Sequence, residues 1–368
     1  MHFHEFLGAI GPEVESAEEE AFTLFSQEIP SQNLGFVDSR ANTIDVTIQG
    51  RDIQIRQSPT ILSSTRAGGT TGAVLWKITP LIAEWLSSKQ NILWTSSILS
   101  QDSTVVELGC GTSGLIALTL APSVSHYIAT DQEYVHKLLK ENLEANTTTI
   151  TADSTTPRRN DHHRQRRGSR KLPSNKSSNA QHSPSPSRPH KGTSAGNITF
   201  AELDWELDSP STLKQAIMLS SSLEKPKRKR TPTEVEQEGE EEEEDLGFDL
   251  LLACDCIYND ALIDPFVQTC ADICRLRPGF APLSSNAPQT QLWAPPMIPV
   301  KKTQPTVCLI AQQLRAPDVF ESWLQAALAE FWVWRVCDEV IEKGMGEGLG
   351  LGLKGGSGYV VHVLVLKE

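Results

Sequence analysis

The sequence predicts an α/β fold built on a doubly wound, mostly parallel sheet. From Thr104 onward, short apolar and β-branched runs alternate with segments of helical periodicity, which is typical of strand–helix–strand units. A glycine-rich turn connects the first run to its helix. The last two runs are joined by a glycine-rich loop over 343–358, which predicts an antiparallel hairpin closing the sheet edge.

Seven apolar runs supply the predicted strands. They are 104–108, 126–130, 197–203, 248–254, 306–311, 331–341 and 359–366. Helical spacing predicts helices between them at 115–120, 134–146, 261–276 and 318–330. Upstream, residues 43–56 alternate apolar and polar on either side of Gln49-Gly50, which predicts a β-hairpin. Residues 72–87 also have helical spacing, with Pro80 near the start.

Charge and composition indicate one domain lengthened by inserts, although 368 residues could hold two or three domains. Residues 154–196 hold ten Lys or Arg and one acid, with almost no apolar residues. A basic run over 225–230 and nine acids over 234–245 follow. Such segments cannot bury enough apolar surface to fold. We therefore expect an N-terminal extension over 1–70 with the hairpin, and a domain over 71–368 with disordered inserts near 154–196, 225–245 and 278–305.

The charge of the remaining chain points to a class of partner. The formal net charge is −13, and the three charged blocks carry +9, +5 and −9, so the rest carries −18. An acidic body favours a basic protein partner over nucleic acid, although the basic insert could contact RNA. No window approaches about 18 uninterrupted apolar residues, so we expect no membrane span.

Seven cysteines in so long a chain indicate no disulfide framework, and the N-terminus lacks the pattern of a secretory signal. We expect a cytoplasmic monomer. The run Lys-Pro-Lys-Arg-Lys-Arg over 225–230 matches a nuclear import signal, and a solubilising loop is the competing interpretation.

The first predicted strand leads into the strongest chemical motif. Glu107 is followed by glycines at 109, 111 and 114, and Asp131 ends the next predicted strand. Glycines allow a tight turn and close approach of a ligand to the backbone, and a carboxylate at the second strand can accept hydrogen bonds from ribose hydroxyls. The pattern predicts a site for a nucleoside-type cofactor. A plain strand–helix turn with an unrelated surface Asp is the alternative.

Several short motifs together resemble the family 16 protein methyltransferases. They are Glu107-Leu108-Gly109-Cys110-Gly111, Thr71-Gly72-Ala73-Val74-Leu75-Trp76, Leu203-Asp204-Trp205-Glu206 and Asp255-Cys256-Ile257-Tyr258. The resemblance covers roughly 43–146, 197–277 and 306–366. It implies a Rossmann-like class I methyltransferase fold, S-adenosyl-L-methionine as cofactor and transfer of methyl groups to protein lysines, with a large-subunit ribosomal protein as the expected substrate. The third loop glycine of the family falls at Ser113, next to Gly114.

The resemblance assigns roles at matching positions. Trp76 and Trp205 would frame the cofactor, Gly109 and Gly111 would form its loop together with Glu107 and Cys110, Asp131 would hold the ribose, and Cys254 would line the pocket. Asp255 and Tyr258 would be the catalytic pair facing the substrate lysine. The alternative for these residues is a role in the fold and not in binding or catalysis. The tryptophans and Tyr258 can be packing residues, and Asp255 can cap a helix.

Three alternatives remain at this point. The chain could methylate a small molecule or a nucleic acid, or it could be a cofactor-binding interaction module without activity. Cys270 and Cys274 lie one helical turn apart, but no second ligand pair at zinc-site spacing accompanies them, so we expect no metal.

Overall fold

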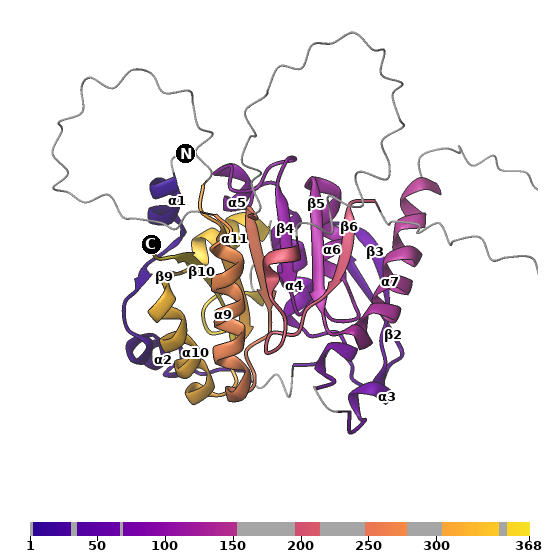
Figure 1. Ribbon diagram of the computed structural model, residues 1–368, viewed down its shortest axis with the longest axis horizontal. Coiled ribbons are helices and arrows are strands. Elements are labelled where there is room, and N and C mark those ends of the chain that lie inside the picture. Colours follow the sequence, from indigo (N-terminus) through magenta and orange to yellow (C-terminus); the bar gives the residue numbers. More distant parts are fainter. Residues whose placement is uncertain are drawn as a thin grey trace, which may run out of the picture.

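An eight-stranded mixed sheet forms the centre of the computed structural model, which describes residues 3–30, 35–66, 69–152, 196–213, 247–277, 304–345 and 352–368 (Figure 1). The strand order is β1-β9-β10-β8-β7-β4-β5-β6. The strands are β1 (Glu13–Val14), β4 (Thr104–Leu108), β5 (His126–Asp131), β6 (Ile198–Glu202), β7 (Leu250–Cys254), β8 (Val307–Gln313), β9 (Phe331–Arg335) and β10 (Tyr359–Leu366).

The strand directions confirm the predicted fold class. The five adjacent strands β8, β7, β4, β5 and β6 are parallel to one another, whereas β10 is antiparallel to both β8 and β9. The chain runs outward from β4 through β5 to β6 and then returns to β7 on the other side of β4. This reversal makes a switch point between β4 and β7, and open α/β sheets bind ligands beside the carboxyl ends of strands at such a point.

The antiparallel edge differs from the prediction in two respects. Strand β10 lies between β8 and β9, and β1 of the N-terminal extension pairs outside β9, so the sheet has eight strands where seven were expected. Residues 336–341 do not continue β9, because Asp338–Met345 form helix α11. Acidic residues favour the first turn of a helix, and Ile341 and Met345, one turn apart, are buried together.

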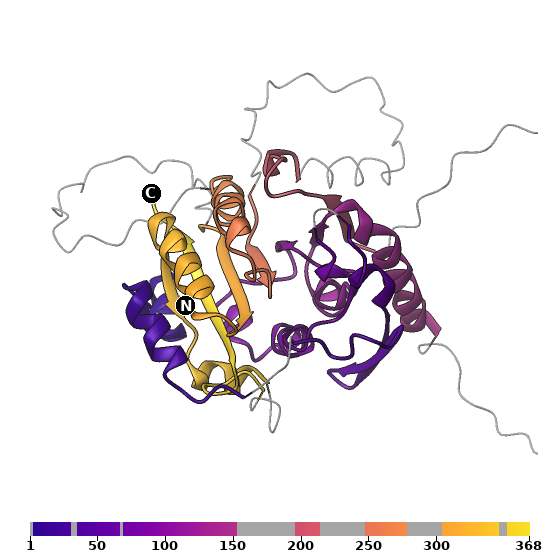
Figure 2. The ribbon, with the colours of Figure 1, turned by 90° about the horizontal axis from the view of Figure 1, so that it is seen from below.

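Helices cover both faces of the sheet (Figure 2). One face carries α1 (Phe3–Ile10), α4 (Ile78–Ser87), α6 (Leu115–Leu120), α7 (Glu133–Ala152) and α11, and the other carries α2 (Ala17–Phe25), α9 (Ile263–Cys274) and α10 (Pro317–Glu330). Alternate strand residues supply the two cores: Val105 and Leu250 face the first set, and Val106 and Leu251 face the second. Short helices α3 (Pro59–Leu62) and α5 (Ile92–Thr95) complete the described set.

The predicted hairpin is present and packs against the first core. Strands β2 (Thr43–Ile48) and β3 (Arg51–Arg56) meet at Gln49-Gly50, where both residues have positive φ, as such a turn requires. Helix α7 holds the outer edge of β3. The amide of Asn142 both donates to the Arg56 carbonyl and accepts from the Arg56 N–H, each at 2.8 Å, as a neighbouring strand would.

A buried charge cluster attaches the N-terminal extension to the sheet. Glu20 on α2 accepts from Arg335 at 2.9 Å and lies 3.1 Å from Nε2 of His362, which is fully buried on β10. Burial alone would raise the pKa of Glu20, but hydrogen bonds and charge from His362 and Arg335 hold it below its ordinary value. The pairing stabilises the docked helix while Glu20 is ionised.

In the part of the chain that the structure describes, no helix combines the length and apolar composition needed to cross a bilayer. Of the three predicted inserts, only residues 196, 304 and 305 belong to the described ranges. The inserts and the division at residue 70 therefore stay predictions.

Candidate functional site

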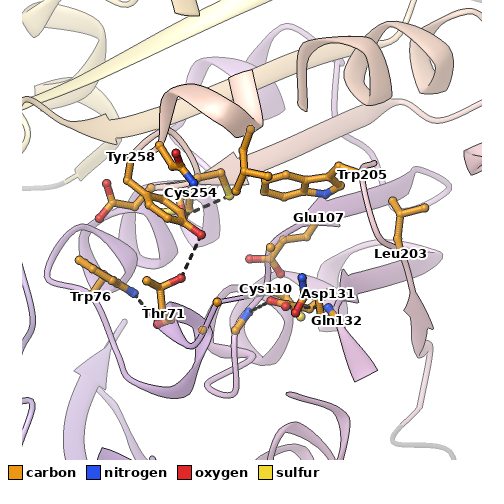
Figure 3. Close-up of a pocket in the computed structure, with 18 of the residues that line it drawn as sticks. Thr71, Trp76, Glu107, Cys110, Asp131, Gln132, Leu203, Trp205, Cys254 and Tyr258 are labelled. Carbon is orange, nitrogen blue, oxygen red and sulfur yellow. Dashed lines mark hydrogen bonds between the residues drawn. The ribbon is translucent and has the colours of Figure 1, made fainter. Parts of the chain in front are cut away.

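A pocket of about 410 Å³ opens beside the carboxyl ends of β4, β5 and β7 (Figure 3). The short 3₁₀ helix Thr71–Ala73 and the segment after β6 form its other walls. The volume falls within the usual range for a small-molecule site. Every one of the ten residues predicted for the cofactor and substrate lines this pocket, so the structure brings the whole predicted set together.

The loop after β4 depends on glycine at three positions. Gly109, Gly111 and Gly114 have φ of 66°, 62° and 53°. A Cβ at Gly109 would lie 2.7 Å from Sγ of Cys256, and one at Gly111 would lie 3.2 Å from the Gly72 carbonyl oxygen. The left-handed conformation falls on Gly114 and not on Ser113, so the serine introduces no backbone strain.

Asp131 holds this loop. Its Oδ2 accepts from the Gly111 N–H at 2.8 Å, and its Oδ1 accepts from the Gln132 N–H at 2.7 Å. Burial raises the pKa of Asp131 to about 6, although these two hydrogen bonds oppose the rise. Each carboxylate oxygen keeps an acceptor site, so the proposed contact with a ribose is open to it.

Glu107 is buried on β4 beneath the pocket. Its side chain accepts from the Tyr127 hydroxyl at 2.6 Å. Burial raises the pKa of Glu107 to about 7, the Tyr127 hydrogen bond lowers it in part, and the negative charge of Asp131 raises it further. The pocket floor therefore carries two carboxyl groups whose ionisation a cationic ligand would favour.

The two predicted tryptophans lie on opposite sides of the pocket (Figure 3). Trp76 donates from Nε1 to the Thr71 carbonyl at 3.1 Å and packs against Phe36, with ring centroids 4.5 Å apart. Trp205 packs against Phe266 of α9, with centroids 5.0 Å apart. Both rings are half-buried and line the pocket, so each is anchored by packing and still presents surface to a ligand.

The two predicted cysteines contribute to the walls in different ways. Cys110 is buried, and its backbone N–H donates to the Thr130 carbonyl at 3.0 Å. Cys254 ends β7, with its Sγ 3.9 Å from the Thr79 hydroxyl. Burial raises the pKa of both thiols, so they act as neutral pocket walls.

Asp255 has the most constrained geometry of the site. Its φ is +61°, an uncommon value for a residue with a side chain, and it follows directly after β7. Its Oδ1 accepts from Arg315 at 2.7 Å and from the Gln313 N–H at 3.2 Å, while Oδ2 accepts from a second nitrogen of Arg315. The side chain is only 1% exposed. Three of about four acceptor sites are thus occupied, which leaves one on Oδ2.

Tyr258 forms the outer rim. The residue is 40% exposed, and the Thr71 hydroxyl donates to its hydroxyl at 3.2 Å across the pocket mouth (Figure 3). Burial of the hydroxyl raises the pKa of Tyr258, although the Thr71 hydrogen bond lowers it in part. The phenol therefore stays protonated near neutral pH and can donate to a ligand.

Several site residues were absent from the sequence prediction. Arg315 donates to Asp255 at 2.7 Å, and the hydroxyl oxygen of Tyr134 accepts from the Gly72 N–H at 3.1 Å. The sequence did carry a signal for Arg315. Three polar residues, Gln312, Gln313 and Arg315, follow the predicted strand 306–311, and ligands bind at such strand ends. Tyr134 carries no comparable signal, since it also has the spacing of a core helix position.

The charge of the pocket lining is one-sided. Five carboxyl-bearing residues line it, and no lysine or arginine of the described ranges does, although Arg315 behind the wall pairs with Asp255. The five are Glu107, Asp131, Asp204, Glu206 and Asp255. Cys270 and Cys274 lie elsewhere, buried in α9, and within the described residues no three potential metal ligands gather.

Comparison with known proteins identifies what the chain resembles. A family model described as lysine methyltransferase matches residues 56–158. Ribosomal lysine N-methyltransferase 5 of Zygosaccharomyces rouxii is 29% identical over 297 residues, covering 77% of this chain and 73% of the relative. The protein of the same name from Candida glabrata is 25% identical, covering 85% of this chain and 88% of the relative.

A further relative matches only a part of each protein. The diaminohydroxyphosphoribosylamino-pyrimidine deaminase of Schizosaccharomyces pombe is 35% identical over 134 residues. The match covers 36% of this chain and 32% of that protein, so the chain spans about a third of its length. Among solved structures, the CurJ carbon methyltransferase matches with a TM-score of 0.33 and 12% identity, covering 79% of this chain and 56% of that one. The resemblance to lysine methyltransferases therefore rests on the family model and the yeast relatives.

Proposed function

We propose that the chain is an S-adenosyl-L-methionine-dependent protein-lysine N-methyltransferase and that its target lysine lies in a protein of the large ribosomal subunit. The similarity to the lysine methyltransferase family model and to the two yeast proteins supports this reaction. The names of these two relatives support a ribosomal protein as the target.

The anionic lining of the pocket is the observation that carries the proposal. S-adenosyl-L-methionine brings a positive sulfonium and an ammonium group, and a lysine side chain is also a cation at neutral pH. Five carboxyl-bearing residues and no basic residue of the described ranges line the pocket. Such a lining attracts these cations and repels the phosphates of a nucleic acid or a nucleotide.

The residues present suit this cofactor. Gly109 and Gly111 line the pocket with backbone atoms, so a ligand can contact the loop backbone directly. Asp131 would accept from the ribose hydroxyls, and Glu107 would lie near the positive end of the cofactor. Trp76 and Trp205 would hold it from both sides. When bound, the cofactor supplies a methyl group on a positively charged sulfur.

The reaction requires the protein to align the amine of the substrate lysine with the methyl carbon and to favour the neutral form of that amine. The lysine nitrogen must lose its proton before its lone pair attacks the methyl carbon, because an ammonium has no free pair. Asp255 would orient the incoming ammonium through the remaining acceptor site on Oδ2. Burial, together with the cofactor's positive charge, would then favour loss of the proton to solvent. Tyr258 and Thr71 would close the mouth over the reacting atoms and limit access of water.

Location and assembly remain proposals. Action on a ribosomal protein suits the expected cytoplasmic monomer, and contact of the basic insert with ribosomal RNA is a further expectation. Residues 154–195 of that insert and the basic run over 225–230 lie outside the described residues.

Transfer of radioactive methyl groups tests the proposal against its alternatives. Purified protein is incubated with tritiated S-adenosyl-L-methionine and large ribosomal subunits from yeast, and protein and RNA are then separated and counted. Label in protein that hydrolyses to methyl-lysine supports the proposal. Label in the RNA fraction would favour nucleic-acid methylation, and no label above that of boiled enzyme would favour a binding module.

A further inference from the structure

A second, smaller cavity of about 50 Å³ lies next to the main pocket and shares Tyr258 with it. Its walls come from the segment after β7, the carboxyl end of β8 and the first turn of α10. Ile257, Val319 and Phe320 give it apolar sides, whereas Gln312 and Arg315 are polar. The volume suffices for a peptide carbonyl group or a water molecule and is far below that of the cofactor pocket.

Two residues that line this cavity each carry a buried nitrogen donor that has no hydrogen-bond partner among the described residues. The donors are Nε2 of Gln312, whose residue is 2% exposed, and Nε of Arg315. Buried polar groups are almost always hydrogen-bonded, because an unpaired donor in an apolar setting is costly. An amide can turn to present its oxygen, but a guanidinium nitrogen can only donate, so Arg315 determines that the missing partner is an acceptor.

The charge of the cavity indicates the kind of acceptor. The two terminal nitrogens of Arg315 are bound to Asp255 and to the Oε1 of Gln313, so the guanidinium charge already has its counter-charge. A second carboxylate would have no cation left to balance it, whereas a neutral carbonyl oxygen needs none. Helix α10 begins beside the cavity without a side-chain cap at Ala316, and the positive end of its dipole also favours an oxygen atom.

We propose that this cavity is a substrate subsite that takes a main-chain carbonyl oxygen of the polypeptide next to the target lysine. Gln312 and Arg315 donate to that oxygen, and the apolar walls contact the rest of the carbonyl group. The arrangement connects recognition with chemistry, because Arg315 also holds Asp255 and Tyr258 separates the two cavities. The subsite would make the enzyme select an extended polypeptide segment over free lysine. This inference rests on the proposed function.

Gln312→Leu tests the subsite with little risk to the fold. The change removes an unpaired donor and keeps a similar volume, so the melting temperature should stay the same or rise. Initial rates of tritium transfer are measured over a range of concentrations of protein extracted from yeast large subunits. The KM for the extracted protein should rise about tenfold, while the dissociation constant for S-adenosyl-L-methionine stays within about twofold.

A second variant places a larger apolar side chain in the cavity. Val319→Phe should raise the same KM, whereas Leu328→Phe, at a half-buried position near the other end of α10, is the control and should not. An unchanged KM in Gln312→Leu and Val319→Phe would mean that the cavity holds solvent only and would overturn the subsite. A lower melting temperature in Gln312→Leu would overturn the premise that the Gln312 amide nitrogen is unpaired, because the amide would then have a partner in the free protein. Absence of label with the wild-type protein would refute the proposed function, and the subsite with it.

Discussion

Replacement of Glu107 by glutamine should make the cofactor-free protein more stable, by an amount that depends on pH. The Glu107 carboxyl is 3% exposed, and burial raises its pKa from the ordinary 4.5 to about 7. The folded protein therefore keeps a proton that the unfolded chain releases between these values. The contribution of the protonated Glu107 carboxyl to the free energy of unfolding is fully present below pH 4.5, and it is lost as the pH rises through about 7.

The difference between the two pKa values sets the size of the effect. Ionisation of Glu107 costs the folded state about 3 kcal/mol at pH 8 and less than about 1 kcal/mol at pH 5. Glutamine carries no charge at either pH, and its side-chain oxygen can still accept from the Tyr127 hydroxyl. Glu107→Gln should therefore gain about 3 kcal/mol at pH 8 and little at pH 5.

Urea unfolding followed by tryptophan fluorescence at the two pH values measures this difference. Glu206→Gln, at an exposed position of the same pocket, is the matched control and should change the free energy of unfolding by less than about 0.5 kcal/mol. An equal gain from Glu107→Gln at pH 5 and pH 8, or a loss at pH 8, would refute the assignment of Glu107 as a carboxyl held against its ionisation.

Three further predictions test other parts of the site and its support, one of them with a matched control. Asp255→Ala should abolish methyl transfer yet leave the calorimetric dissociation constant for S-adenosyl-L-methionine within about threefold; full activity would remove Asp255 from the reaction. Gly114→Ala should cost about 2 kcal/mol in urea unfolding, because its φ is +53° and a Cβ would lie 2.5 Å from Leu139. Gly196→Ala, with φ +60° and open space around it, should cost about 1 kcal/mol, and equal costs would mean that packing at Gly114 is unimportant. Glu20→Leu leaves Arg335 without its counter-charge and His362 without its hydrogen-bond partner, and it should cost about 3 kcal/mol; a loss below about 1 kcal/mol would show that the cluster does not stabilise the extension.

Most of the sheet and its strand ends could be predicted from the sequence. Apolar runs such as 248–254 are buried on both faces, and periodicity locates runs of this kind well. The motifs at Glu107, Asp131 and Asp255 fall at strand ends, so parallel topology alone brings them to one edge. The ten predicted site residues therefore line one pocket, while their individual roles remain to be tested.

Other features depend on long-range contacts that a local pattern does not carry. The edge strand β1 is two residues long, and its pairing with β9 joins segments more than three hundred residues apart. The ion pair of Asp255 with Arg315 likewise joins residues that are neighbours only because β7 and β8 are adjacent. Residues 338–345 form a helix because Ile341 and Met345 reach the core, which the glycine-rich sequence around them concealed.

Mass spectrometry of large-subunit ribosomal proteins from cells of the source organism tests the proposed reaction most directly. Cells that lack this protein are compared with cells that carry either the wild-type form or Asp255→Ala. We predict that one large-subunit protein gains the mass of one or more methyl groups on a single lysine with the wild-type form alone. Identical masses in all three samples, or a methyl group that persists without this protein, would contradict the proposal.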